Sequence, residues 1–139
     1  MTTKILWVED DYYHIQYLFH HLQKEGAVIT PALSACDAYR LVEKGNKFDL
    51  MVVDIILPIS SSLEKLPDTV ADWNLEKYPG IGLVKWLKGK KKVDCPVVIL
   101  SVIDDPICEY DLTEFNVDEV ILKKGLGPHE FTEKIKPFL

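Results

Sequence analysis

The chain has 139 residues, of which 47% are hydrophobic and 27% are charged. These values are typical of a single globular domain with its own core, which we expect over residues 1–139, and they argue against a disordered chain. The net charge of -6 argues against nucleic acid as a direct partner, because binding to a phosphate backbone needs a basic surface.

No targeting or membrane segment is visible in the sequence. The N-terminus runs into a hydrophobic strand without an apolar signal region, and no apolar run approaches the roughly 20 residues that span a bilayer. We therefore expect no membrane partner and a cytoplasmic location. Cys36, Cys95 and Cys108 are odd in number and widely spaced, which favours reduced, buried thiols over a disulfide framework or a zinc site.

Short hydrophobic runs alternate with segments of helical periodicity along the chain. The runs predict strands at residues 5–8, 27–30, 50–53, 97–100 and 120–122. Apolar spacing and boundary residues predict a helix that ends at Gly26, one capped by Ser34, one over residues 80–88, one that opens at 104–106 and one that starts at Pro128. This alternation predicts an α/β fold with a doubly wound, five-stranded parallel sheet covered on both faces.

Polar side chains follow the hydrophobic runs at the points where four of the predicted strands end. They are Glu9, Asp10, Asp54, Ser101 and Lys123. Ligands of an open parallel sheet bind at the carboxyl ends of its strands, so we expect these side chains to share one pocket. Two carboxylates about 4 Å apart repel each other by roughly 4 kcal/mol at an effective dielectric constant of 20, which favours a bound cation.

Magnesium suits such a pocket because it prefers oxygen ligands and is usually held by one or two carboxylates and a phosphate. We expect Asp10 as a direct ligand, Glu9 as a direct or water-mediated ligand, and one oxygen of Asp54 together with the backbone carbonyl of Ile56. The other Asp54 oxygen is then a nucleophile toward a phosphoryl donor. Lys123 is expected to neutralise the phosphoryl oxygens, and the Ser101 hydroxyl to donate a hydrogen bond to the bound phosphoryl group.

Each of these signals is weak by itself. Asp10 or Asp11 could cap the first helix, Asp54 could be an acid of a turn, Ser101 could be a cap, and Lys123 could be a surface charge. Their joint order and their placement at strand ends favour the pocket.

With these strand-end residues in this order, the sequence resembles the receiver domain of two-component response regulators over nearly its whole length. The matching motifs are ILWVEDD at residues 5–11, VVDIILP at 52–58, GIGLV at 80–84, VILS at 98–101 and DEVILK at 118–123. The resemblance implies a single receiver domain with a flavodoxin-like (βα)5 fold, Asp54 as the phosphoacceptor, and Glu9 and Asp10 as magnesium-binding acids. It also implies a histidine kinase or phosphotransfer protein as donor and a downstream protein as target, and it leaves room for a homodimer.

The sequence departs from the family pattern at several positions. Lys124 stands where the family commonly has a proline after the lysine, and Val102 and Val120 stand where it has a small residue and an aromatic switch residue. A degenerate receiver, which binds partners without being phosphorylated, is therefore the main alternative.

An enzyme is less favoured than either receiver hypothesis. Phosphatases with an aspartate nucleophile generally carry a second aspartate two residues later, where this chain has Ile56. The acids at residues 9–11 would repel the phosphate of a flavodoxin-like cofactor. His14 and His21 are two helical turns apart, too far to share one ion, and we expect all four histidines at the surface.

A connecting segment at about residues 59–79 interrupts the alternation, and receivers usually have a shorter loop there. Val70, Trp73 and Lys77 are helically spaced after Pro67, which predicts one or two turns of helix. We consider two hypotheses: a loop packed passively on the sheet edge, or a lid or docking surface whose order depends on the state of Asp54.

Overall fold

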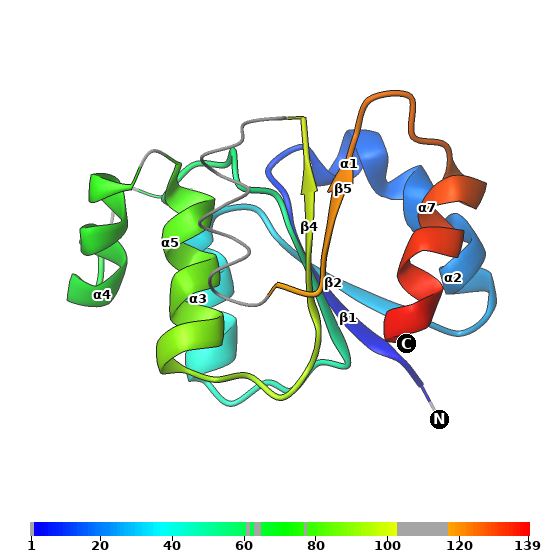
Figure 1. The fold of residues 1–139 in the computed structure, drawn as a ribbon. Helices are drawn as coiled ribbons and strands as arrows, with labels where there is room; N and C mark the ends of the chain where they lie inside the picture. The colour runs from blue at the N-terminus through cyan, green and yellow to red at the C-terminus, as the bar shows by residue number, and fades with distance from the viewer. Residues whose placement is uncertain (1, 61, 63–64, 77, 103–116) are drawn as a thin grey trace.

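A five-stranded, all-parallel sheet organises the chain (Figure 1). The computed structural model describes residues 2–60, 62, 65–76, 78–102 and 117–139. The strands, in the spatial order β2-β1-β3-β4-β5, are β1 (Lys4–Val8), β2 (Val28–Ala32), β3 (Leu50–Val53), β4 (Val97–Ser101) and β5 (Glu119–Leu122). The predicted fold class and doubly wound sheet are confirmed, whereas the helix predicted at 104–106 lies outside the described residues.

Helices cover both faces of the sheet. One face carries α3 (Ala35–Glu43), α4 (Asp68–Ala71) with the 3-10 turn η2 (Asp72–Leu75), and α5 (Pro79–Lys85) with the π-helical turn η3 (Trp86–Lys90). The other carries α1 (Tyr12–Ile15), η1 (Gln16–Phe19), α2 (His20–Lys24), α7 (Pro128–Ile135) and η4 (Lys136–Phe138). Figure 1 shows α4 as an outer layer beyond α5, whereas α1, α2 and α7 form a single layer.

Two predicted elements differ from the structure in more than one terminal residue. The helix predicted to end at Gly26 is divided into α1, η1 and α2, because a 3-10 turn interrupts it. The second strand runs on through Pro31, which pairs with Trp7. A proline is tolerated there because β2 is an edge strand, so the missing N–H leaves no neighbour unpaired.

The central strands β1, β3 and β4 alternate their side chains between two separate hydrophobic cores. Leu6, Met51 and Ile99 face the core under α3 and α5, and Trp7 and Val52 face the core under α1, α2 and α7. All five are at most 2% exposed, which confirms the expectation that these strands are buried on both faces. Each such side chain contributes about 1.5–3 kcal/mol to folding by leaving water.

The described part of the connecting segment is folded and belongs to the core. Val70 is fully buried and Trp73 is 6% exposed, as their helical spacing predicts, while Lys77 lies outside the described residues. This burial agrees with the hypothesis of a segment that packs passively on its neighbours. The second hypothesis, in which the order of the segment depends on the state of Asp54, stays a prediction.

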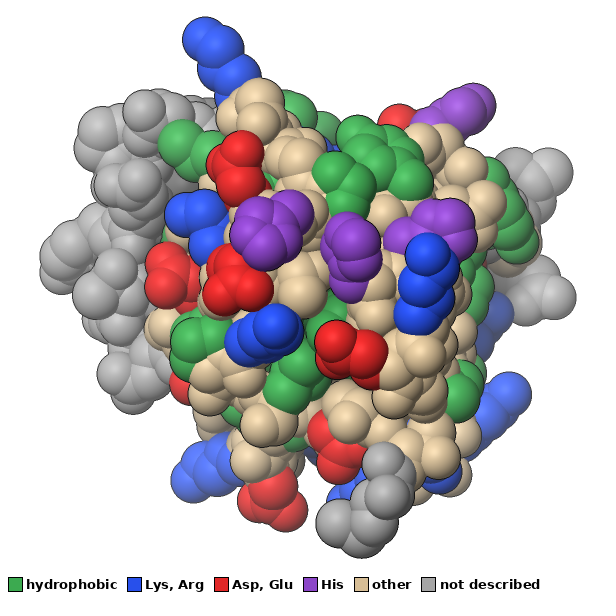
Figure 2. Space-filling model, turned by 90° about the vertical axis from the view of Figure 1, so that its right-hand side faces the viewer, with side chains coloured by type: hydrophobic (Ala, Val, Ile, Leu, Met, Phe, Trp, Pro, Cys, Tyr) green, Lys and Arg blue, Asp and Glu red, His purple; other side chains and the backbone are tan. Residues whose placement is uncertain are grey.

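The histidines lie on the outer face of α1, α2 and α7, where Figure 2 shows imidazole side chains gathering. All four are exposed, as expected. Cys36 is buried, as expected, but Cys95 is only half-buried, so the expected burial is wrong for it, and Cys108 lies outside the described residues. Among the residues that the structure describes, no helix has the length and apolar character needed to cross a bilayer.

Candidate functional site

The backbone ladder brings the acids of β1 and β3 to the same edge of the sheet. The Glu9 N–H donates to the carbonyl of Ala32 (2.8 Å), and the Asp54 N–H donates to the carbonyl of Val8 (2.9 Å). Both bonds continue the strand pairing one residue past the strand ends, which aligns the two side chains. The predicted meeting of strand-end acids follows from this register.

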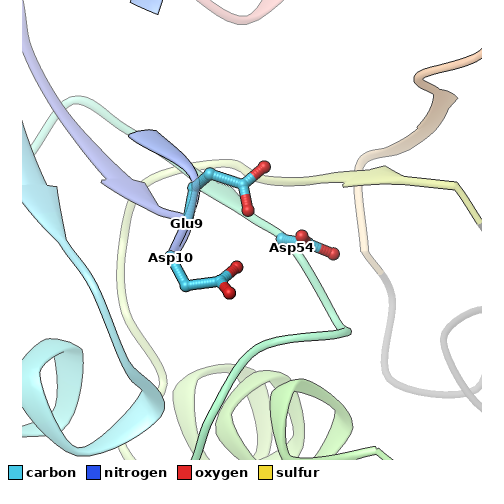
Figure 3. Close-up of side chains that lie close together, drawn as sticks. All are labelled: Glu9, Asp10 and Asp54. Carbon is cyan, nitrogen blue, oxygen red and sulfur yellow. The ribbon is translucent and has the colours of Figure 1, made fainter. Parts of the chain in front are cut away.

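Glu9, Asp10 and Asp54 form one cluster, and Figure 3 shows their side chains close together at the ends of the strands. One oxygen from each lies within 4.8 Å of the others. Glu9 and Asp54 are buried, whereas Asp10 is exposed at the mouth of the cluster. The cluster therefore has a dry interior and one carboxylate open to solvent.

Lys123 joins this cluster from the end of β5. Its Nζ donates to Asp54 Oδ2 (2.9 Å) and also to Glu9 Oε1. The Lys123 side chain is 18% exposed, so the ammonium lies inside the pocket instead of on the surface. The surface-charge alternative for Lys123 is wrong.

Asp54 is oriented by the chain that follows it. Its Oδ1 accepts a hydrogen bond from the backbone N–H of Ile56 (2.9 Å), while Oδ2 accepts from Lys123. The sequence indicated the Ile56 carbonyl as a participant but not its amide, which fixes the rotamer of the carboxylate. The role of the Ile56 carbonyl as a metal ligand stays a prediction.

Ser101 is the last residue of β4 and lies beside Lys123. The Lys123 N–H donates to the Ser101 carbonyl (2.8 Å), and the Ser101 side chain is buried. The Lys123–Lys124 peptide bond is trans. The structure thus places Ser101 at the same edge as the acids, one strand away from Asp54.

The first helix does not use Asp11 as a side-chain cap. Asp11 occupies the N-cap position of α1, but no side-chain hydrogen bond caps this helix. Its Oδ1 lies 2.5 Å from Nδ1 of the exposed His14 instead. The capping alternative is therefore wrong for Asp11.

Burial and mutual repulsion dominate the electrostatics of the pocket. The pKa of Glu9 is raised from 4.5 to about 8. Burial is the largest cause and the neighbouring Asp54 is the next, whereas Lys123 opposes the shift. Burial alone would lower the pKa of Lys123, but the hydrogen bonds with Glu9 and Asp54 outweigh it and raise that pKa. One ammonium therefore faces three carboxyl groups, which leaves the site with less positive charge than its acids would need to be fully ionised.

A divalent cation fits the groups present. The donors are carboxylate oxygens, and the buried Oε2 atom of Glu9 has no hydrogen-bond partner among the described residues. A buried acceptor without a partner is rare in folded proteins and calls for an explanation, and a cation bound by the carboxylate is one that fits this donor set. Magnesium, which takes oxygen ligands and keeps several waters, matches this donor set and the exposed position of Asp10.

Comparison with known proteins supports the fold alone. No protein-family model matches the sequence, and no curated protein matches it. Among solved structures, the receiver domain of the Francisella response regulator 1452 is similar with a TM-score of 0.71 and 22% identity, covering 98% of this chain and 95% of that one. The Vibrio cholerae chemotaxis response regulator CheY4 is similar with a TM-score of 0.73 and 17% identity over the full length of both chains.

A third similar structure is the BeF3-activated DrrB receiver domain, with a TM-score of 0.67 and 19% identity, covering 99% of this chain and 97% of that one. All three cover nearly the whole chain. The chain therefore has the flavodoxin-like fold of response-regulator receiver domains, as the sequence resemblance implied.

Proposed function

We propose that this chain is a phosphoacceptor receiver domain, which takes a phosphoryl group onto Asp54 in a magnesium-dependent reaction. The observation that carries the proposal is the position of the Lys123 ammonium, bonded to the carboxylates of both Glu9 and Asp54 at the carboxyl edge of the sheet. An ammonium between two buried acids can turn to a new anionic group formed there. An acidic cluster without this cation would support only metal binding.

The chemistry divides among the residues of the cluster. A carboxylate oxygen of Asp54 attacks phosphorus, an O–P bond forms, and the P–N bond to a donor histidine breaks as the imidazole leaves with the bonding electron pair. The Ile56 amide holds the carboxylate in one orientation during the attack. Lys123 then neutralises the oxygens of the transferred group, and the Ser101 hydroxyl donates a hydrogen bond to it.

Glu9, Asp10, Asp54 and the Ile56 carbonyl would hold the magnesium ion. The ion supplies positive charge that neutralises the phosphoryl oxygens and relieves the repulsion among the acids. A magnesium ion bound here would give the buried Oε2 atom of Glu9 a partner, and its charge would favour the ionised form of Glu9, whose pKa is otherwise raised.

The proposed partners follow from the fold and the reaction. The donor would be a histidine kinase or a phosphotransfer protein in the cytoplasm, and a downstream protein would bind the modified domain. The chain would not act as an enzyme beyond its self-phosphorylation and a slow loss of the phosphoryl group.

The test is phosphorylation by acetyl phosphate with magnesium, read by intact mass. The parent should gain one phosphoryl group, Asp54→Asn should gain none, and Asp11→Asn should gain one, since Asp11 is an exposed acid outside the cluster. Chelation of magnesium should prevent labelling. A parent that takes no label and binds no beryllofluoride would identify a degenerate receiver instead.

A further inference from the structure

The first turn of α5 packs directly on the backbone that carries the phosphoacceptor. A Cβ atom at Gly80 would lie 2.4 Å from Cα of Ile55 and 2.7 Å from the carbonyl oxygen of Asp54. The Gly80 N–H also donates to the Ile55 carbonyl (3.2 Å). Only a residue without a side chain allows this approach, so the turn and the loop 54–56 are in backbone contact.

Trp73 of η2 packs on the opposite side of the same turn. A Cβ atom at Gly82 would lie 2.4 Å from Cγ and 2.6 Å from Cβ of Trp73. Residues two apart in an α-helix point about 200° apart, so Gly80 and Gly82 face opposite directions. The first turn of α5 is therefore held between the loop 54–56 and the Trp73 indole.

The Trp73 indole is itself held in place. It is 6% exposed, and its ring lies 6.1 Å from Tyr39 of α3 and 6.2 Å from Trp86, measured between ring centroids. An ion pair from Glu76 to Lys85 (3.0 and 3.2 Å) ties the end of η2 to α5. Packed interiors are stiff, so a support at this position transmits displacement and does not absorb it.

We propose that Trp73 is a positioning residue for the phosphoacceptor loop, acting through the first turn of α5. This inference rests on the proposed function of Asp54 and deepens it. The connecting segment is then part of the support of the site, because its indole fixes Gly80 against Asp54 and Ile55. By linkage, a ligand that reorders the loop also changes the packing of Trp73.

Leu87 provides a control in the same hydrophobic core, where it is fully buried. It lies seven residues beyond Gly80, about 10 Å further along the helix axis, so it stabilises the helix away from the first turn. Trp86 is not suitable, because its ring packs near Trp73. Trp73→Leu and Leu87→Ala each remove buried apolar groups, and Trp73→Phe restores an aromatic ring at the position of interest.

The experiment measures beryllofluoride affinity with magnesium, urea stability, and hydrogen exchange of the amides of residues 54–56. We expect Trp73→Leu to weaken the affinity about tenfold and to speed exchange at 54–56, as small misplacements of reacting groups do. Trp73→Phe should recover most of both. Leu87→Ala should lower stability and leave the affinity and the exchange at 54–56 unchanged.

Equal effects of Trp73→Leu and Leu87→Ala on affinity and on exchange would overturn the inference, since Trp73 would then act on stability alone. If the parent binds no beryllofluoride, the proposed function fails, and exchange at 54–56 decides the positioning role by itself. Faster exchange in Trp73→Leu but not in Leu87→Ala would retain that role, and equal exchange would reject it.

Discussion

The two faces of the sheet are built differently. Under α1, α2 and α7, the central aromatic residue is Trp7, which lies on the sheet itself, is fully buried and contacts Phe19 of η1 with ring centroids 3.9 Å apart. A single helical layer covers it, and Tyr13 and Tyr17 on its outside are 67% and 48% exposed. Under α3 and α5, the tryptophans lie on helical segments, and α4 with η2 adds an outer layer.

This difference separates the two halves of the candidate site. Glu9 and Asp10 lead into α1, a four-residue helix without a side-chain cap, on the thinly covered face. Asp54 leads into a loop that α5 and Trp73 support from the thickly covered face. We infer that different helical layers support Glu9 with Asp10 and support Asp54, and that substitutions on each face can separate the two. Lys123 is the contact that they share, since it is bonded to both Glu9 and Asp54.

The largest effect is expected from the centre of the thinly covered face. Trp7→Ala should lower the free energy of unfolding by about 3–5 kcal/mol, because the cavity would open between Phe19 and Phe131. Tyr17→Ala, in the same helical layer but half-exposed, should change it by about 0.5 kcal/mol. Urea denaturation gives both values, and similar losses would show that this face does not depend on its inner aromatic core.

A smaller effect is expected from pH at Glu9. Its pKa is raised from 4.5 to about 8, so the folded protein keeps a proton that the unfolded chain releases across this window. The free energy of unfolding should therefore fall as pH rises from 5 to 8 in the absence of magnesium. Glu9→Gln resembles the protonated form, so its stability should match the parent near pH 5 and exceed it by about 1–4 kcal/mol at pH 8.

Thermal and urea denaturation across this pH range check the expectation. Glu25→Gln is the control, since it makes the same substitution at an exposed acid at the end of α2. An unchanged pH dependence in Glu9→Gln would mean that the buried carboxyl is not the strained group. Magnesium should stabilise the parent more than Glu9→Gln.

The smallest of these effects is expected at the contact between α5 and Trp73. Alanine usually stabilises a helix interior relative to glycine, but Gly82→Ala should destabilise this protein by about 1–3 kcal/mol, because its methyl group would overlap the indole. Gly127→Ala, where a Cβ atom meets nothing within 4 Å, is the control without steric overlap, and any loss there reflects only its position as the N-cap of α7. Adding Trp73→Leu should relieve most of the Gly82→Ala penalty in a double-mutant cycle, and strictly additive losses would contradict the contact.

Local sequence signals predicted most elements. The hydrophobic run Leu50–Val53 predicted β3, Ser34 predicted the cap of α3, and its hydroxyl accepts from the Asp37 N–H (3.1 Å). Boundaries were wrong where tertiary context overrode local propensity, as in β2, which continues through Pro31 because it lies at the sheet edge.

The sequence also predicted which side chains would meet, since residues that follow parallel strands share one edge. Glu9, Asp10, Asp54 and Lys123 come together for that reason. It could not reveal that Lys123 bridges two acids or that the Ile56 amide orients Asp54, because these contacts depend on the depth of the pocket and on rotamers.

The contact by which Trp73 supports the site also could not be predicted from the local sequence. Gly80 and Gly82 are two residues apart at the start of a helix, a signal of close approach, but the sequence does not state what approaches them. Periodicity and strand ends fix the fold class and the identity of the edge residues because both depend on neighbours along the chain. The tertiary structure decides the hydrogen bonds, the pKa of Glu9 and the packing of α5 between the loop 54–56 and Trp73, because these depend on atoms that are distant in sequence and packed within a few ångströms.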